Sequence, residues 1–531
     1  MDYQRRRRRP RAAGAMIPLA LALACGDSEQ GTQGTTAGGS TGAATETSGG
    51  VTGGASGAAT TTGGATTAGV TTASTTASTS TSDGTGSTAS SVGETETSTG
   101  GQDCDGEIVT FETGKSPAVE LHLAPDGVDA GDCGDPQSPC QSLEYAAALA
   151  GPGAAIRLHA GTYGGGAFLN DLQGDAGAPI WIGGAPGEPR PVISGGAEAL
   201  HLTRARYLIV HDLEVTGQTG NGINADDGGD YGDPDATRHL VFRDLHIHDV
   251  GDGGNQDCLK LSGLDDYFVL DSEFSACGGG GQGSGVDHVG CHHGLLARNN
   301  FHDMGGNAIQ CKGGADDIEI RQSRFDEVGE RGVNMGGSTG DEFFRPPLST
   351  QSPNFEARDI RVIANEFRGS NAALAFVGCV DCLAANNTID TPHNWVLRIL
   401  QEKTSTPEHE FLPASGGRLV NNLIYFDRGD LSTYVNIGPN TDAPSFSFTT
   451  NLWYAYDAPG QSNPGGDLPA PEQGGIYGVD PLLGDPGGGD YSIDLASPAA
   501  GAGTTIDELT RDVVDVCYLD PPAIGARERP E

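Results

Sequence analysis

Residues 292–337 nearly repeat themselves with an offset of 24 positions. Apolar and glycine residues keep their places, pairing Leu296 with Ile320, Phe301 with Phe325, Ile309 with Val333, and Gly313 with Gly337. Related segments, in which apolar and polar residues alternate ahead of a polar turn, recur from "YLIVHDLEV" to "FTTNLW" at spacings of 22 to 42 residues. Alternation with period two indicates strands, and repetition at this length indicates a solenoid. Leucine-rich repeats share the period, but the chain lacks their regular leucine ladder.

A parallel β-helix accounts for this pattern, because each coil adds one rung to every sheet and insertions become loops. Asparagines recur at the turn of successive units, at Asn300, Asn365, Asn387 and Asn422. Stacked turn amides can bond from rung to rung, so we expect these four residues to be structural.

The chain resembles the right-handed parallel β-helix proteins of the pectate-lyase-like group from about Val119 to Ala526. The segment "SLEYAAALA" (Ser142–Ala150) is similar to the capping helix of such domains, with Ser142 as the N-cap. The closing "GGGDYSIDLASPAAGAGT" is similar to the usual end of these proteins. The resemblance implies an all-β, right-handed parallel β-helix over residues 102–531. The group contains lyases, hydrolases, epimerases and adhesins, so it implies no single reaction.

The N-terminus has the layout of an export signal. A basic run, "RRRRRPR", precedes a short apolar stretch that ends in "LALAC", which resembles a bacterial lipobox. Residues 1–25 are therefore predicted to be a signal peptide, with Cys25 carrying lipid. Residues 26–101 are rich in Thr, Ser, Gly and Ala and are predicted to be a disordered linker. We expect an extracytoplasmic monomer, held at the bacterial outer membrane or cell surface through lipid only, or secreted if cleavage falls near Ala24 instead.

Ten cysteines remain when Cys25 is set aside, and an exported chain favours their pairing. Cys133 and Cys140 flank the turn-forming "GDPQSP" and are the predicted disulfide. Cys379 and Cys382 suggest a disulfide or buried thiols, since no second pair stands at zinc-finger spacing.

The net charge is −41, from 71 acidic and 30 basic residues. Nucleic acid is excluded as an expected partner, because phosphate binding needs a basic face. The acidic excess suggests either calcium or a solvated surface.

A second strand follows the turn in each unit, and its alternate residues are predicted to face outward. Stacked at about 4.8 Å per rung, the outward set is Asn224, Asp226, Lys260, Ser262, Asp287, Gln310, Lys312 and Asn334, with Arg398 further along. Such a ladder suits a glycan lying along it, and a solvated polar face is the alternative. Asn224, Gln310, Asn334 and Arg398 are the candidate substrate-binding residues.

Two neighbouring acidic loops offer oxygen ligands for calcium. The candidates are Asp226, Asp227, Asp230 and Asp257. Ordinary Gly/Asp turn chemistry is the alternative.

The favoured activity is β-elimination on a uronate-containing polysaccharide. This reaction needs the uronate carboxylate neutralised and a base beside the α proton. Lys260 or Lys312 is the candidate base, and Asp257 and Asp287 are further candidate catalytic residues. His292 and His293 follow the Asp287 rung and are secondary catalytic candidates, although surface histidines are common.

Two alternatives remain open. "NADD" and "NQDC" resemble motifs of polygalacturonase-like hydrolases, which would make Asp226 and Asp257 an acid/base pair. The second alternative is a non-catalytic glycan-binding or adhesive surface protein, over which an enzyme is slightly favoured.

Overall fold

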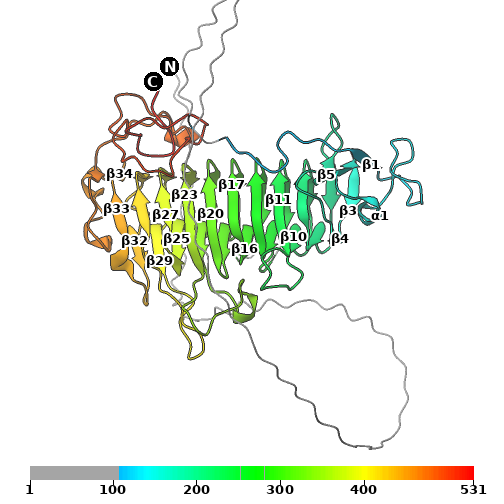
Figure 1. Cartoon of the computed structure of the whole chain (residues 1–531). Helices are drawn as coiled ribbons and strands as arrows, with labels where there is room; N and C mark the ends of the chain where they lie inside the picture. Colours follow the sequence, from blue (N-terminus) through cyan, green and yellow to red (C-terminus); the bar gives the residue numbers. More distant parts are fainter. Residues whose placement is uncertain (1–103, 105–106, 252, 280–281, 531) are drawn as a thin grey trace, which may run out of the picture. The chain divides into compact units, whose positions relative to one another are not determined.

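The computed structural model describes residues 104, 107–251, 253–279 and 282–530. Their strands form three parallel sheets of 13, 12 and 10 strands (Figure 1). The chain passes from the 13-stranded to the 12-stranded to the 10-stranded sheet and then returns, for example through β14 (Leu264–Leu270), β15 (Glu273–Cys277), β16 (Ser284–Val289) and β17 (His292–Ala297). The fold is the predicted right-handed parallel β-helix, the hand that parallel crossovers favour.

The 13-stranded sheet contains β1 (Val119–Leu123), β2 (Ala154–Leu158), β5 (Ile180–Gly184), β8 (Arg206–His211), β11 (Thr237–Arg243), β14 (Leu264–Leu270), β17 (His292–Ala297), β20 (Ala315–Arg321), β23 (Ala357–Ile363), β26 (Cys379–Val380), β27 (Leu383–Ala385), β30 (Arg418–Val420) and β33 (Ser447–Thr449). The 12-stranded sheet contains β3 (Thr162–Gly164), β6 (Val192–Ser194), β9 (Glu214–Thr216), β12 (His246–Val250), β15 (Glu273–Cys277), β18 (Asn300–His302), β21 (Arg324–Asp326), β24 (Glu366–Arg368), β28 (Thr388–Asp390), β31 (Leu423–Phe426), β34 (Leu452–Ala455) and β35 (Ile476–Tyr477). The 10-stranded sheet contains β4 (Ala167–Asn170), β7 (Leu200–Thr203), β10 (Ile223–Asp226), β13 (Leu259–Ser262), β16 (Ser284–Val289), β19 (Asn307–Lys312), β22 (Arg331–Gly336), β25 (Ala372–Val377), β29 (Trp395–Leu400) and β32 (Val435–Ile437). Short 3₁₀ turns lie at η1 (Asp341–Phe343), η2 (Ala443–Ser445), η3 (Pro459–Gln461), η4 (Gly465–Asp467) and η5 (Pro486–Gly488).

The predicted capping helix is α1 (Leu143–Leu149). Ser142 is its N-cap, and the Ser142 hydroxyl accepts a hydrogen bond from the Tyr145 amide at 3.3 Å. Buried Leu143 and Ala146 pack toward the solenoid interior, so α1 covers the apolar end of the first coil.

Identical inward positions stack through the core, as the repeat predicts. Phe301 and Phe325 lie directly opposite each other in β18 and β21, with ring centroids 5.1 Å apart. Phe367 continues the stack at 4.5 Å from Phe325. Ile309 likewise lies opposite Val333. The near-duplication therefore exists because each rung needs the same inward residues.

The asparagine ladder is present, with one correction. The backbone amide of Asn365 donates to the side-chain oxygen of Asn387 at 3.0 Å, and that of Asn387 donates to Asn422 at 3.1 Å. The prediction for Asn300 is wrong, because Asn300 is exposed on β18 and its buried neighbour Asn299 takes the ladder position. The Asn299 side-chain oxygen accepts from the Ser272 amide at 3.0 Å.

Four disulfides join described cysteines, pairing Cys104 with Cys517, Cys133 with Cys140, Cys258 with Cys277, and Cys379 with Cys382. Cys291 and Cys311 are free and buried. Cys25, the predicted signal peptide and the predicted linker lie outside the described residues. Among the described helices, none has the length and apolar character needed to cross a bilayer.

Candidate functional site

The outward face of the 10-stranded sheet carries a column of polar side chains in register. Asn224 lies opposite Lys260, Lys260 opposite Asp287, Asp287 opposite Gln310, and Gln310 opposite Asn334. Ala375 separates Asn334 from Arg398 in the same column. Because parallel strands place successive rungs at about 4.8 Å, the column is a polar track over five consecutive coils from Asn224 to Asn334, and Arg398 extends it beyond Ala375.

Asp287 lies between two lysines from the coils on either side. Lys260, on β13, donates a hydrogen bond to Oδ2 of Asp287, and Nζ of Lys312, on β19, lies 3.5 Å from the same oxygen. The side chains are only 8% exposed for Lys260, 7% for Lys312 and 2% for Asp287. Burial acts to raise the pKa of Asp287, but the charges of the two lysines outweigh it and lower that pKa.

Asp257, in the loop before β13, joins Lys260, Asp287 and Lys312. We call these four residues the Asp–Lys cluster. Oδ2 of Asp257 lies 3.5 Å from Nζ of Lys260, and its Oδ1 accepts from the Ser284 amide at 2.7 Å. Burial, helped by the charge of Asp287, raises the pKa of Asp257 to about 7 in spite of the lysines. The site thus holds two carboxyl groups whose pKa values are pushed in opposite directions, as in acid/base pairs.

Lysine is rare in this chain, yet two lysines meet in the Asp–Lys cluster. The sequence has four lysines, Lys115, Lys260, Lys312 and Lys403, and two of them meet at one carboxylate. Arginine supplies most other cations but stays protonated, whereas a lysine can lose its proton when its surroundings disfavour the charge. The scarcity of lysine is a sequence signal that the ladder prediction did not use.

The sequence prediction missed the insertion of residues 337–356, which packs beside the Asp–Lys cluster through Glu356. Buried Glu356 accepts from the amide and hydroxyl of Thr339, both at 2.8 Å, and from the Gly313 amide at 3.0 Å. Burial raises the pKa of Glu356. Lys403 donates a hydrogen bond to the Thr339 carbonyl oxygen at 2.8 Å and so helps to hold the insertion in place. The long 42-residue spacing between Phe325 and Phe367 was the available signal for it.

The four carboxylates expected to bind calcium have separate cationic partners. Asp226 pairs with His201 at 2.7 Å, and Asp230 pairs with Arg204. Asp227 is buried and bound in bidentate fashion by Arg345, at 2.8 and 3.2 Å, while Asp257 faces Lys260. Among the described residues, no three of these four carboxylates bring ligand atoms within 4.8 Å of one another. This donor set does not fit a calcium ion that needs six to eight oxygens.

The candidate substrate-binding residues are held by neighbours along the track. Nδ2 of Asn224 lies 3.1 Å from Nε2 of His201. The amide oxygens of Gln310 and Asn334 accept from Asn307 at 3.3 Å and Arg331 at 2.6 Å. Arg398 donates to Asn436 at 3.0 Å and stacks on Trp395, 4.3 Å from the ring centroid. Arg331 was not predicted, and it adds a further cation to the track.

His292 and His293 do not lie on the polar track. They begin β17 in the 13-stranded sheet, where Nδ1 of His293 lies 2.6 Å from Oδ1 of Asp265. The chain has passed from one sheet to the next between Asp287 and His292, so sequence proximity to Asp287 did not place them beside it.

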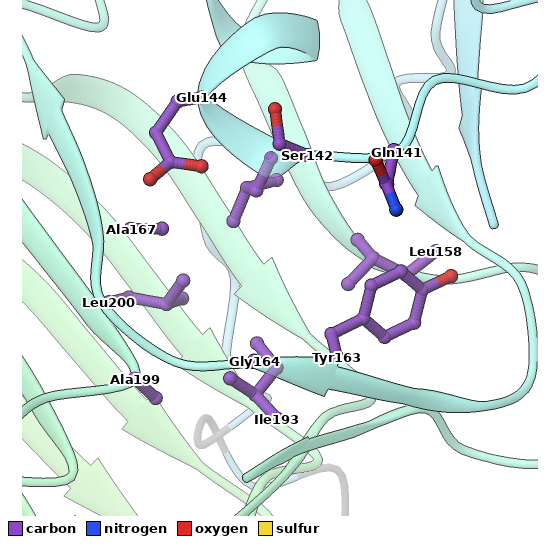
Figure 2. A pocket seen from close by; sticks show the side chains of 11 residues that line it. Gln141, Ser142, Glu144, Leu158, Tyr163, Gly164, Ala167, Ile193, Ala199 and Leu200 are labelled. Atoms are coloured by element: carbon purple, nitrogen blue, oxygen red, sulfur yellow. The ribbon is translucent and has the colours of Figure 1, made fainter. Parts of the chain in front are cut away.

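A cavity of about 150 Å³ lies under α1 at the end of the solenoid (Figure 2). Figure 2 shows Glu144 above a lining of Leu158, Tyr163, Ile193 and Leu200, which are interior positions of the first coils. The cavity belongs to the capped core end, and its lining lacks the paired charges of the Asp–Lys cluster.

No family model and no curated protein matches the sequence. Among solved structures, the pectate lyase Pel9A is similar with a TM-score of 0.48 and 17% identity, covering 78% of this chain and 98% of its own. An alginate lyase from Paenibacillus sp. str. FPU-7 gives 0.38 and 17%, covering 57% and 96%. The A-module of the mannuronan C-5 epimerase AlgE4 from Azotobacter vinelandii gives 0.36 and 17%, covering 56% and 88%. These names describe those proteins and not this chain.

Proposed function

We propose that this protein is an extracytoplasmic enzyme that cleaves an acidic, uronate-containing polysaccharide by β-elimination at the Asp–Lys cluster. One observation carries the proposal: two of the four lysines converge on buried Asp287 along the outward polar track. Beside them, Asp257 has a pKa raised to about 7 by burial.

β-Elimination needs three groups that the cluster supplies. A base removes the proton α to the uronate carboxyl, the released electron pair forms a carbon–carbon double bond, and the bond to the leaving sugar oxygen breaks. A cation must stabilise the charge that develops on the carboxylate, and an acid returns a proton to the leaving oxygen. We assign the base to Lys312, the stabilising cation to Lys260 and the acid to Asp257.

The two lysines differ in their surroundings, which decides between them. Lys260 contacts two carboxylates, Asp257 and Asp287. Among the described residues, the ion pair of Lys312 is with Asp287, at 3.5 Å, and burial raises the pKa of nearby Glu356, which favours the neutral form of that carboxyl group. We therefore assign the base to Lys312, which has fewer carboxylate contacts, and the stabilising cation to Lys260.

A substrate with many carboxylates must approach a chain of net charge −41. Arg331 and Arg398 extend the cationic character of the track beyond the lysines. Such local cations allow an anionic polymer to bind where the protein as a whole would repel it.

Calcium has no assigned step in this proposal. The ammonium group of Lys260 supplies the positive charge that stabilises the substrate carboxylate. Activity is therefore expected to survive a chelator.

The location is part of the same proposal. Four disulfides are typical of a chain that folds in an oxidising compartment. We place the protein outside the cytoplasm, with lipid on Cys25 as its attachment to the membrane. One chain supplies every member of the cluster, so a monomer suffices.

The deciding experiment incubates the full chain with pectate, alginate and glycosaminoglycans and records two products, unsaturated uronate by absorbance and new reducing ends. Lysis yields both. The variant Lys312→Arg keeps the positive charge but removes a usable base, so kcat is expected to fall at least about 100-fold. Lys115→Arg is the matched control and should retain wild-type kcat, because Lys115 donates to the carbonyl oxygens of Phe111 and Ala176, which are not track residues.

Two other results would replace the proposal. Reducing ends without unsaturated product would indicate a hydrolase. Binding without either product would indicate a glycan-binding protein. This function is favoured by the near-complete burial of the four cluster side chains, because side chains that neutralise one another inside the protein can be structural rather than catalytic.

A further inference from the structure

A second group of titratable side chains lies on the 13-stranded sheet, apart from the polar track. Asp265 and Asp266 come from β14, His292 and His293 from β17, and Asp317 from β20. We call these five residues the His–Asp patch. Asp265 lies directly opposite His292 in the strand register, so the patch bridges successive coils.

The ligand atoms of the patch converge. Single ligand atoms of Asp265, Asp266 and His293 all lie within 4.8 Å of one another. Nδ1 of His292 lies 3.7 Å from Oδ2 of Asp265, and Nε2 of His293 lies 4.0 Å from Oδ2 of Asp317. Two atoms bound to one zinc ion at about 2.1 Å are at most about 4.2 Å apart, so small side-chain rotations close the set.

The orientation of His292 independently points to a ligand. Its Nε2 lies 3.3 Å from the carbonyl oxygen of Arg345, which can accept only if Nε2 carries a proton. Nδ1, the other ring nitrogen, faces the carboxylate of Asp265. A backbone carbonyl that fixes the tautomer in this way is the usual partner of a metal-binding histidine.

We propose that the His–Asp patch binds a divalent transition-metal ion of the zinc class. Asp265, Asp266 and His293 are the central ligands, and His292 is the fourth. Mixed imidazole and carboxylate donors suit zinc, whereas calcium prefers oxygen ligands alone. The ion would tie β14 to β17 on a face that the proposed lyase chemistry does not use.

Neighbouring cations restrict the site without filling it. Arg238 binds Asp266, and Arg361 binds Asp317 at 2.6 Å. His239 lies 3.7 Å from Asp266 on the adjacent coil. A carboxylate can bind a guanidinium with one oxygen and a metal with the other, so Asp266 can serve both. Asp265, which contacts two histidines, is the anchor.

The test uses the full chain, freed of metal with a chelator and carrying no histidine tag, titrated with Zn²⁺ in a calorimeter. One equivalent is expected to bind. His293→Gln is the informative variant because this side chain is 56% exposed and its loss leaves the core intact. It should weaken Zn²⁺ binding at least about ten-fold. Co²⁺ bound at the site should show the visible absorption of a low-coordinate ion, and His293→Gln should lose it.

The matched control is His302→Gln. His302 also contacts two carboxylates, Glu273 and Asp303, but lies on β18 outside the patch. Its loss should leave Zn²⁺ affinity unchanged. Absence of stoichiometric binding to the wild-type chain, or an equal loss in both variants, would overturn the proposal.

Discussion

Lys312 and Asp287 lie on neighbouring coils, with Nζ 3.5 Å from Oδ2, and Lys260 approaches that same oxygen from the other side. Asp287 is therefore the carboxylate that the two buried lysines share. Asp287 acts through these lysines, so we regard it as a positioning residue rather than a catalytic one.

Asp287→Asn would leave the two ammonium groups facing each other without their shared counter-charge. Removing one partner of a buried ion pair costs about 3–5 kcal/mol, and we expect a loss of unfolding free energy in that range. Urea denaturation measures it. Asp175→Asn makes the same chemical change at an exposed carboxylate and should stay within about 0.5 kcal/mol of wild type. Equal stability of the two variants would contradict the buried ion pair.

Asp257 should make stability depend on pH in a definite direction. Burial raises its folded-state pKa from 3.8 to about 7, so the folded chain retains a proton that the unfolded chain has lost. Stability from this group is complete below the unfolded pKa and is lost as pH rises through the folded one. Asn cannot ionise, so the free energy of unfolding of Asp257→Asn relative to wild type should increase as pH rises from about 4 to about 7. A constant difference over that window would refute the shift.

The sequence was sufficient to predict the fold because the solenoid repeats its inward residues. Phe301 over Phe325 and Ile309 over Val333 follow from the 24-residue offset. The outward column from Asn224 to Asn334 follows from the period-two alternation of side chains within each strand. The strand register then places these outward residues opposite one another.

The errors arose where the backbone leaves the strand conformation. Arg298 has a φ of 57°, a left-handed turn that shifts the side-chain alternation by one residue and places Asn299 inside instead of Asn300. Every ladder residue stands two places before its stacked apolar residue, as Asn299 does before Phe301 and Asn365 before Phe367. Pairs such as Asp227 with Arg345 join residues 118 positions apart, and no local pattern encodes that contact.

The corrected ladder gives a direct comparison. Asn387→Ala would leave the buried Asn365 amide and the Val362 carbonyl, which now bond to Asn387 at 3.0 and 2.9 Å, without partners. Each such group costs about 1–3 kcal/mol, so a loss of about 3 kcal/mol is expected in urea denaturation. Asn300→Ala, at the exposed neighbouring position, should change the free energy of unfolding by less than about 0.5 kcal/mol. A large effect at Asn300 would restore it to the ladder.

Arg398 should contribute to binding and not to the reaction. It lies further along the track, stacked on Trp395, and contacts none of the cluster residues directly. Arg398→Ala is therefore expected to raise KM for the polymer about ten-fold with kcat nearly unchanged. Arg298→Ala, which removes an arginine paired with Asp271 on another face, is the control and should leave both constants unchanged. A kcat effect as large as that of Lys312→Arg would place Arg398 in the reaction itself.

His288 offers a test of the interior that is separate from the polar track. It is fully buried beneath Asp287, where Nδ1 lies 2.9 Å from the Gln310 carbonyl oxygen and burial lowers the pKa to about 4. A histidine held neutral stabilises the fold above its unfolded pKa of about 6.5, and that stability is lost as pH falls toward the folded pKa. His288→Leu should therefore lose less unfolding free energy than wild type between about pH 6.5 and pH 4.

The opposite sign is expected for His302, whose hydrogen bonds to Asp303 and Glu273 overcome the effect of burial and raise its pKa. Stability from His302 is complete below its unfolded pKa of about 6.5 and is lost as pH rises through the folded one, so wild type should lose more unfolding free energy than His302→Gln as pH rises above about 6.5. Urea denaturation of the three proteins from about pH 4 to about pH 8 measures the two effects in separate pH windows, and a wild-type acid response in His288→Leu would show that His288 is not held neutral.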